Sequence, residues 1–313
     1  MNARSVIYIC LANLLGGSSY VVTSLALRGF TSVELVFWRI LAAALLLSLL
    51  LFSRLRKLKL SAEDWLRTAA VGVLGYAAPL LIGTRGQELS SSTKAALLIG
   101  IEPVSIVLLS ALFLGERLSG RRIACILCGL IGGVLIVLQG SAPMARTLTP
   151  DLLGDLLLFL HGFGWALYTI IGKPVLRRVD PLTFTGLTTL FALAPTAPLA
   201  WSSLSRPRHC PPESIAALAY LTVAVTILAC WCWNKAMEEI PASSLANFIF
   251  LQPLVGVLLG VGVQGEALTR WSAAGGVMIL AGAYGSTLIP LAAESSTRPA
   301  KASPNESGAP SRV

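Results

Sequence analysis

The sequence predicts an all-α polytopic membrane protein with ten transmembrane helices arranged as two inverted five-helix repeats. Three observations lead to this prediction: the composition, an internal duplication and the distribution of charge. Of the 313 residues, 55% are hydrophobic and only 12% are charged, whereas soluble domains carry about 25% charged residues. The apolar runs have the length of about 20 residues that a helix needs to cross a bilayer, which is too long for barrel strands.

Ten apolar segments follow one another with few residues between them, and each is predicted to form one transmembrane helix. They cover residues 5–27, 32–52, 65–84, 92–114, 121–139, 152–172, 181–201, 213–233, 242–263 and 271–291. Residues 293–313 are polar and rich in Pro and Ser, so we expect a disordered cytoplasmic tail there.

The chain contains an internal duplication with a shift of 150 residues. Residues 98–118, LIGIEPVSIVLLSALFLGERL, align without a gap with residues 248–268, FIFLQPLVGVLLGVGVQGEAL. Across a window of 45 positions that includes this stretch, the shift gives 13 identities. Pro103 aligns with Pro253, and a Gly-Glu pair follows each run in the same register. Chance matches between apolar runs do not explain a shared proline and a shared Gly-Glu pair.

Positive charge lies mainly on one side of the predicted topology. With the N-terminus inside, 16 of the 24 Lys and Arg residues fall in inner segments and 7 in outer segments, while Arg39 lies within the second span. Because Lys and Arg concentrate on cytoplasmic loops, both termini are predicted to be cytoplasmic, in the cell (inner) membrane. Five spans per half give the repeats, residues 1–145 and 146–292, opposite orientations, a design that many secondary transporters use. The net charge of +9 therefore orients the chain and indicates no nucleic-acid partner.

Glu102 is the strongest candidate for a functional residue within a span. It lies in the fourth span directly before Pro103, and ionisable residues are costly inside a membrane. Because proline has no N–H to donate, the carbonyl of Ile99 is expected to be free and the helix to kink, as at Pro253. The second repeat carries neutral Gln252 at the equivalent position. Glu102 is thus a predicted contact for a proton or a substrate, with structural pairing to a neighbour as the alternative.

Arg39 in the second span also requires a partner. Glu34 precedes it by five residues and so does not share the helix face that residues three or four apart share. Arg39 is therefore expected either to snorkel toward the outer surface, in a structural role, or to bind an anionic group of a substrate.

Aromatic residues complete the predicted site. Trp165 and Tyr168 are three residues apart and share one face of the sixth span, while Tyr20 has the related position in the first span. They are expected to form the wall of a cavity for apolar or aromatic solutes. His161 is interpreted as structural. The predicted substrate-binding residues are Tyr20, Arg39, Glu102, Trp165, Tyr168 and Gln252.

Two further motifs have structural interpretations. Gly115-Glu116 and Gly265-Glu266 are predicted to be helix ends, since glycine is favoured just after a helix; a gating salt bridge is the alternative. The pair Cys125-x-x-Cys128 lacks the further ligands of a zinc site. No metal and no cofactor are therefore predicted.

The chain resembles the drug/metabolite transporter superfamily, EamA type. The resemblance rests on ten predicted spans in two inverted halves, on the intramembrane Pro103 and Pro253, on Arg39 and on the repeated L-x-G-E-x-L pattern. The first copy reads LFLGERL at residues 112–118, and the second copy reads GVQGEAL at residues 262–268. The resemblance implies a helical bundle with a central cavity, alternating access, and export of amino acids, related metabolites or drugs.

The leading functional hypothesis is therefore that the chain, embedded in the lipid bilayer, is a secondary transporter that moves a small solute across the membrane. Proton coupling through Glu102 is left open. No phosphate-binding P-loop motif is present, so ATP-driven transport is not indicated. The alternative is an intramembrane lipid-modifying enzyme or a lipid-handling protein, but neither His-Glu-x-x-His nor Gly-x-Ser-x-Gly occurs. The prediction is that the chain is not an enzyme. The sequence leaves a homodimer open.

Overall fold

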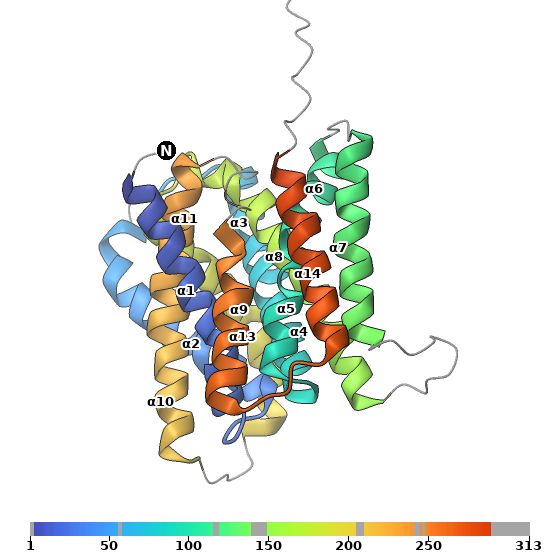
Figure 1. Ribbon diagram of the computed structural model, residues 1–313. Helices are drawn as coiled ribbons and strands as arrows, with labels where there is room; N and C mark the ends of the chain where they lie inside the picture. Colours follow the sequence, from blue (N-terminus) through green and yellow to red (C-terminus); the bar gives the residue numbers. More distant parts are fainter. Residues whose placement is uncertain are drawn as a thin grey trace, which may run out of the picture.

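A computed structural model describes residues 3–55, 58–114, 119–138, 149–204, 210–240, 245 and 248–288. The regular elements that it shows are all helices (Figure 1). In the first half of the chain these are α1 (Ala3–Ala26), α2 (Ser32–Leu55), α3 (Ala62–Ala70), the π-helical η1 (Val71–Ala77), α4 (Ala78–Leu89), α5 (Ser92–Leu98), α6 (Ile101–Leu114) and α7 (Gly120–Leu138). In the second half they are α8 (Pro150–Leu176), α9 (Pro181–Leu204), α10 (Pro212–Tyr220), the π-helical η3 (Leu221–Ala229), α11 (Cys230–Glu239), α13 (Leu251–Gln264) and α14 (Arg270–Leu288).

The described helices fit a multi-pass membrane protein. Eight continuous helical segments are long and apolar enough to cross a membrane. Leu251–Gln264 is apolar but shorter, and the last predicted span appears as the 19-residue helix α14. Ten spanning helices therefore stay a prediction. The predicted boundary at residues 145 and 146 and the predicted tail, residues 293–313, lie outside the described residues.

Helix pairing follows a two-fold pattern between the halves. α2 packs on α9 and α7 packs on α14, so equivalent helices meet each other. The first helix of each half makes corresponding contacts with the other half. α1 packs on the segment made of α10, η3 and α11, and α8 packs on the equivalent segment made of α3, η1 and α4. In addition, α1 contacts α13, and α8 contacts the equivalent elements α5 and α6. Along α7 and α14, Gly132 faces Gly275 and Gly129 faces Gly282, so the two helices run antiparallel. Antiparallel packing of equivalent helices is what inverted repeats produce.

The two ends of the described chain lie at the same end of the bundle (Figure 1). α1 begins at the end where α14 finishes, and the opposite end carries the start of α5 and the finish of α13. This placement agrees with termini on one side of the membrane.

The fourth predicted span is interrupted near its middle. α5 ends at Leu98 and α6 begins at Ile101, so Pro103 lies in the first turn of a new helix, where the missing N–H of proline costs no intrahelical bond. The expectation that the Ile99 carbonyl is free is wrong, because the N–H of Glu102 donates to it at 2.8 Å. In the second repeat Pro253 likewise lies in the first turn of α13, which follows a turn at Phe250.

Each repeat also contains a π-helical stretch that the sequence analysis did not predict. η1 begins at Val71 and η3 at Leu221, which are related by the shift of 150 residues. Both interrupt an otherwise continuous helix next to the centre of the bundle, since η1 packs on α8 and α9 and η3 on α1 and α2. π-helical insertions are rare and are found frequently at functional sites.

α5 and α13 cross at very close range. A Cβ atom at Gly256 would lie 2.3 Å from the Cβ atom of Ala96, so the crossing has no room for one additional methyl group. α13 ends at Gly265, whose φ of 68° is left-handed. The prediction of a helix end is thus confirmed for Gly265-Glu266, whereas Gly115-Glu116 lies outside the described residues.

We predict that Gly256→Ala destabilises the protein by about 1–3 kcal/mol, because the added methyl overpacks the crossing of α5 and α13. Thermal unfolding in detergent measures the effect. The matched control is Gly262→Ala in the same helix, since nothing lies within 4 Å of a Cβ atom there. Equal melting temperatures for the two variants would contradict the close crossing.

Candidate functional site

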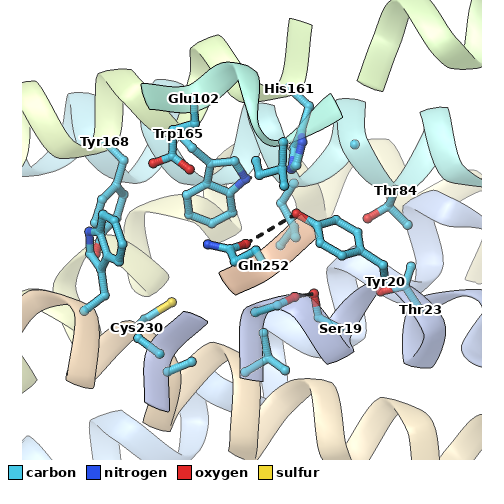
Figure 2. Close-up of a pocket in the computed structure, with 18 of the residues that line it drawn as sticks. Ser19, Tyr20, Thr23, Thr84, Glu102, His161, Trp165, Tyr168, Cys230 and Gln252 are labelled. Carbon is cyan, nitrogen blue, oxygen red and sulfur yellow. Dashed lines mark hydrogen bonds between the residues drawn. The ribbon is translucent and has the colours of Figure 1, made fainter. Parts of the chain in front are cut away.

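A cavity of about 120 Å³ lies where the two halves meet, beside the interruption between α5 and α6 (Figure 2). Its walls come from α1, α2, α4, α8, η3, α11 and α13 and from residues at the interruption. The structure brings all six predicted site residues to this cavity, and these are Tyr20, Arg39, Glu102, Trp165, Tyr168 and Gln252.

Glu102 reaches the cavity from the first turn of α6. The residue is 4% exposed, and among the described residues no ion pair or hydrogen bond engages its carboxyl group. Its backbone N–H completes the turn at Ile99, and its neighbour across the helix contact is Gly162 of α8, where an added Cβ would lie 3.4 Å from the Glu102 nitrogen. The interruption of the helix therefore places a carboxyl group at the cavity wall without a partner from the described chain.

Arg39 is held inside the bundle by the second repeat. Its Nε donates to the Thr226 hydroxyl of η3 at 2.6 Å, and the residue is only 6% exposed. The alternative in which Arg39 snorkels to the surface is therefore wrong. Within the described part of the chain Arg39 forms no ion pair, so the cavity wall holds one guanidinium group and one carboxyl group that are not paired with each other.

Gln252 enters the cavity from the first turn of α13, in the position that corresponds to Glu102. Its Nε2 donates to Oδ1 of Asn13 at 2.9 Å, and its Oε1 lies 3.5 Å from the Tyr20 hydroxyl (Figure 2). Asn13 in turn donates to the carbonyl of Ile9 at 2.7 Å. Two contacts from α1 thus hold the amide of Gln252.

The aromatic side chains of α8 form one wall of the cavity. The ring centroids of Trp165 and Tyr168 are 5.9 Å apart, and Tyr76 of η1 packs edge-on against Trp165 at 5.7 Å. The indole N–H of Trp165 donates to Nε2 of His161 at 2.6 Å. The Tyr168 hydroxyl shares a hydrogen bond with Asn234. The indole N–H of Trp165 and the hydroxyl of Tyr168 are thus engaged within the protein, whereas Nδ1 of His161 has no hydrogen-bond partner among the described residues.

Sequence reasoning missed several residues of the site. His161 was interpreted as structural, yet it lines the cavity, and its spacing of four residues from Trp165 could have indicated a shared helix face. Thr226 and Asn13 hold site residues from another helix, which no local pattern reveals.

In the described residues, no group of three or more His, Cys, Asp or Glu side chains could hold a metal ion.

Polar contacts join the two halves at one end of the bundle, beyond the crossing of α5 and α13. Glu266 lies just after α13, and its carboxylate accepts the backbone N–H groups of Ser92 at 3.0 Å and Thr93 at 2.7 Å. The Ser92 hydroxyl also donates to it at 2.6 Å. A carboxylate at the first turn of α5 accepts hydrogen bonds from N–H groups that have no partner within the helix, and its negative charge interacts favourably with the helix dipole.

An ion pair strengthens the same end. Lys94 of α5 contacts Asp155 of α8 at 2.9 Å and Asp151 at 3.1 Å. Asp155 is fully buried, and the Ser90 hydroxyl donates to it. The first turn of α5 is therefore joined both to α13 and to α8.

Comparison with known proteins gives a consistent result. A model of the EamA-like transporter family matches residues 3–138 and 152–288, one copy in each half. An uncharacterized transporter of Archaeoglobus fulgidus is 28% identical over 288 residues, which cover 91% of this chain and 97% of the relative. The uncharacterized transporter YyaM of Bacillus subtilis is 25% identical, with 88% of this chain and 92% of the relative covered.

Two further similarities concern function and fold. A "Probable amino-acid metabolite efflux pump" of Salmonella typhimurium is 27% identical over 199 residues, which cover 61% of this chain and 65% of the pump. A solved crystal structure superposes with a TM-score of 0.62 at 21% identity and covers 92% of this chain and 98% of its own. At that identity the solved structure shows the fold alone.

Glu266 generates a prediction on acid stability. Burial is the largest influence on its carboxyl group and by itself raises the pKa, but hydrogen bonds from Ser92 and Thr93 together outweigh burial and hold the pKa below its ordinary value. The carboxylate therefore stabilises the folded state above the unfolded pKa of about 4.3, and this contribution is lost as the pH falls through the lower folded pKa.

We predict that Glu266→Gln lowers stability at neutral pH and reduces the loss of stability between about pH 5 and pH 3. Thermal unfolding of the purified protein across this range measures both effects. As a control, Glu63→Gln removes an exposed carboxylate of α3 that pairs with Arg67. The stability of this variant should depend on pH in the same way as that of the wild type. If the stability of Glu266→Gln depended on pH as that of the wild type does, the Glu266 carboxylate would make no contribution to acid stability.

Proposed function

Because the chain belongs to the EamA-like transporter family, we propose that it is a secondary transporter that exports small solutes by alternating access. Its relatives are named transporters or efflux pumps, not enzymes, and its multiple membrane-spanning helices make it a multi-pass membrane protein. The solutes that we propose are amino acids, related metabolites or drugs. We place the protein in the cell (inner) membrane with both termini cytoplasmic, and a homodimer stays a prediction.

One observation carries this proposal: residues from both halves converge on the same cavity. Tyr20, Arg39 and Glu102 come from the first half, whereas Trp165, Tyr168 and Gln252 come from the second. A solute bound there contacts both repeats at once. In inverted-repeat transporters the substrate site lies near the bilayer midplane between the repeats, which move about it.

The chemistry of the cavity supports a small solute with both polar and apolar parts. Aromatic faces of Trp165 and Tyr168 provide apolar contact area, while Arg39 and Glu102 provide opposite charges that are not paired with each other. The Salmonella typhimurium relative is named a "Probable amino-acid metabolite efflux pump", and amino-acid metabolites are solutes of this general kind. An intramembrane enzyme is not supported, because the relatives are named as transporters or efflux pumps.

The proposal is tested by export from cells. Amino acids and related metabolites are quantified by mass spectrometry in the medium of cells that express the protein and in cells that carry an empty vector. Selective accumulation of one unmodified solute supports the proposal. A chemically modified product that depends on the protein contradicts transport.

Glu102 is the residue through which we propose proton coupling. The other ionisable side chains that line the cavity are Tyr20, Arg39, His161, Tyr168 and Cys230. We predict that Glu102→Gln lowers the transport rate by about 10-fold or more, in line with the loss of a hydrogen bond to a charged group, and flattens its dependence on pH. Initial rates in proteoliposomes from pH 5 to 8 measure this. Identical rate profiles for the variant and the wild type would exclude a proton role for Glu102.

Trp165 is predicted to contact the solute through its ring face. Trp165→Ala should weaken the apparent affinity for the exported solute by about 3- to 10-fold, the effect of losing one aromatic contact. Trp201→Ala is the matched control because Trp201 is 80% exposed on the outer surface of the bundle. Transport titrations compare the two variants, and equal affinities would return Trp165 to a packing role.

A further inference from the structure

We propose that Asn13 fixes the amide of Gln252 so that its carbonyl oxygen and the Glu102 carboxylate together form an acceptor site for a protonated amine of the solute. This inference rests on the proposed transport function and specifies which chemical group the central part of the cavity recognises. In it Asn13 is a positioning residue that acts through Gln252.

The hydrogen bonds of Asn13 leave one orientation for the two amides. The carbonyl of Ile9 can only accept a hydrogen bond, so the nitrogen of Asn13 faces Ile9, at 2.7 Å. Oδ1 of Asn13 therefore faces Gln252, and since this oxygen also only accepts, Nε2 of Gln252 must donate to it, at 2.9 Å. Asn13 is fully buried, so no water replaces either bond. The carbonyl oxygen of Gln252 consequently points to the side of Tyr20 and the cavity (Figure 2).

Tight packing keeps the Gln252 side chain in this place. It lies against Gly16 of α1, where an added Cβ atom would be 3.0 Å from Oε1 and 3.1 Å from Cδ of Gln252. At Gly17 an added Cβ would be 2.8 Å from the Gln252 backbone carbonyl. The glycine surface of α1 thus admits the glutamine, while Asn13 sets the direction of its amide.

Two oxygen acceptors, the Glu102 carboxyl and the Gln252 carbonyl, lie on the side of α6 and α13. Two donors of the aromatic wall are used within the protein, since the Trp165 indole donates to His161 and the Tyr168 hydroxyl is engaged with Asn234. The Tyr20 hydroxyl faces Gln252. No hydrogen bond or ion pair within the described chain engages the Glu102 carboxyl, and the Gln252 carbonyl keeps a second lone pair.

An ammonium group satisfies this arrangement. It has three N–H donors and no acceptor, and aromatic faces attract cations. Arg39 is the only Arg or Lys among the described residues that line the cavity, and its bond to Thr226 ties it to η3. An amine is therefore expected on the side of α6 and α13, where both oxygen acceptors lie, with the rest of the solute toward the aromatic wall.

The test measures binding of two matched probes to the purified full chain in lipid nanodiscs. 2-Phenylethylamine carries a protonated amine, and 2-phenylethanol is its neutral counterpart. We expect the wild type to prefer the amine and Asn13→Leu to weaken amine binding about 10-fold while leaving the alcohol nearly unchanged. Ser18→Ala is the control, because Ser18 lies on the same helix and bonds Tyr220 instead of the cavity residues.

A second variant keeps the test decisive if Asn13→Leu folds poorly. Gln252→Met removes the carbonyl itself, so we expect the same loss of amine preference and a double variant that is no worse than either single one. Absence of an amine preference in the wild type, equal loss for both probes, or additive effects would overturn the inference. Export of a solute by the wild type would still stand in those cases, whereas a wild type that exports nothing would contradict the proposed function instead.

Discussion

The hydrocarbon interior of a membrane provides no water for peptide groups, and this constraint governs the centre of the protein. A helix can be interrupted there only if the freed groups find partners or face a polar cavity. The break between α5 and α6 meets this condition because the N–H of Glu102 closes a turn on the Ile99 carbonyl. The same break turns the Glu102 side chain to the cavity wall. The break between α5 and α6 therefore both pairs the freed backbone groups and positions the Glu102 carboxyl group.

The two repeats share a frame but differ in chemistry at the corresponding positions. Pro103 and Pro253 both begin a helix in its first turn, yet one is preceded by a carboxylic acid and the other by an amide. The acid has no partner among the described residues, whereas two contacts from α1 hold the amide of Gln252. Symmetric packing thus places two polar groups at the centre, and the sequence difference gives only one of them the ability to carry charge.

Sequence patterns were sufficient for features that depend on composition and local spacing. Ionisable residues within apolar runs are costly unless they face the interior, so Arg39 and Glu102 could be assigned to the interior. The three-residue spacing of Trp165 and Tyr168 placed these two rings on one helix face. The partner of each residue could not be predicted, because Thr226 and Asn13 approach through tertiary packing. The expectation of a free Ile99 carbonyl failed for a related reason: it assumed a continuous helix, whereas the chain begins a new one.

α13 links the centre of the cavity to the end of the bundle where Glu266 meets α5. Its first turn carries Gln252, and after its last turn the left-handed Gly265 directs Glu266 onto the first turn of α5. Between these points Gly256 leaves no space between α13 and α5. In the alternating access that we propose, one end of the cavity opens while the other closes, so movement of α13 away from α5 would change the surroundings of Gln252 and the hydrogen bonds of Glu266 together. The proposed solute contact at Gln252 is thereby linked to the end of the bundle through one short helix.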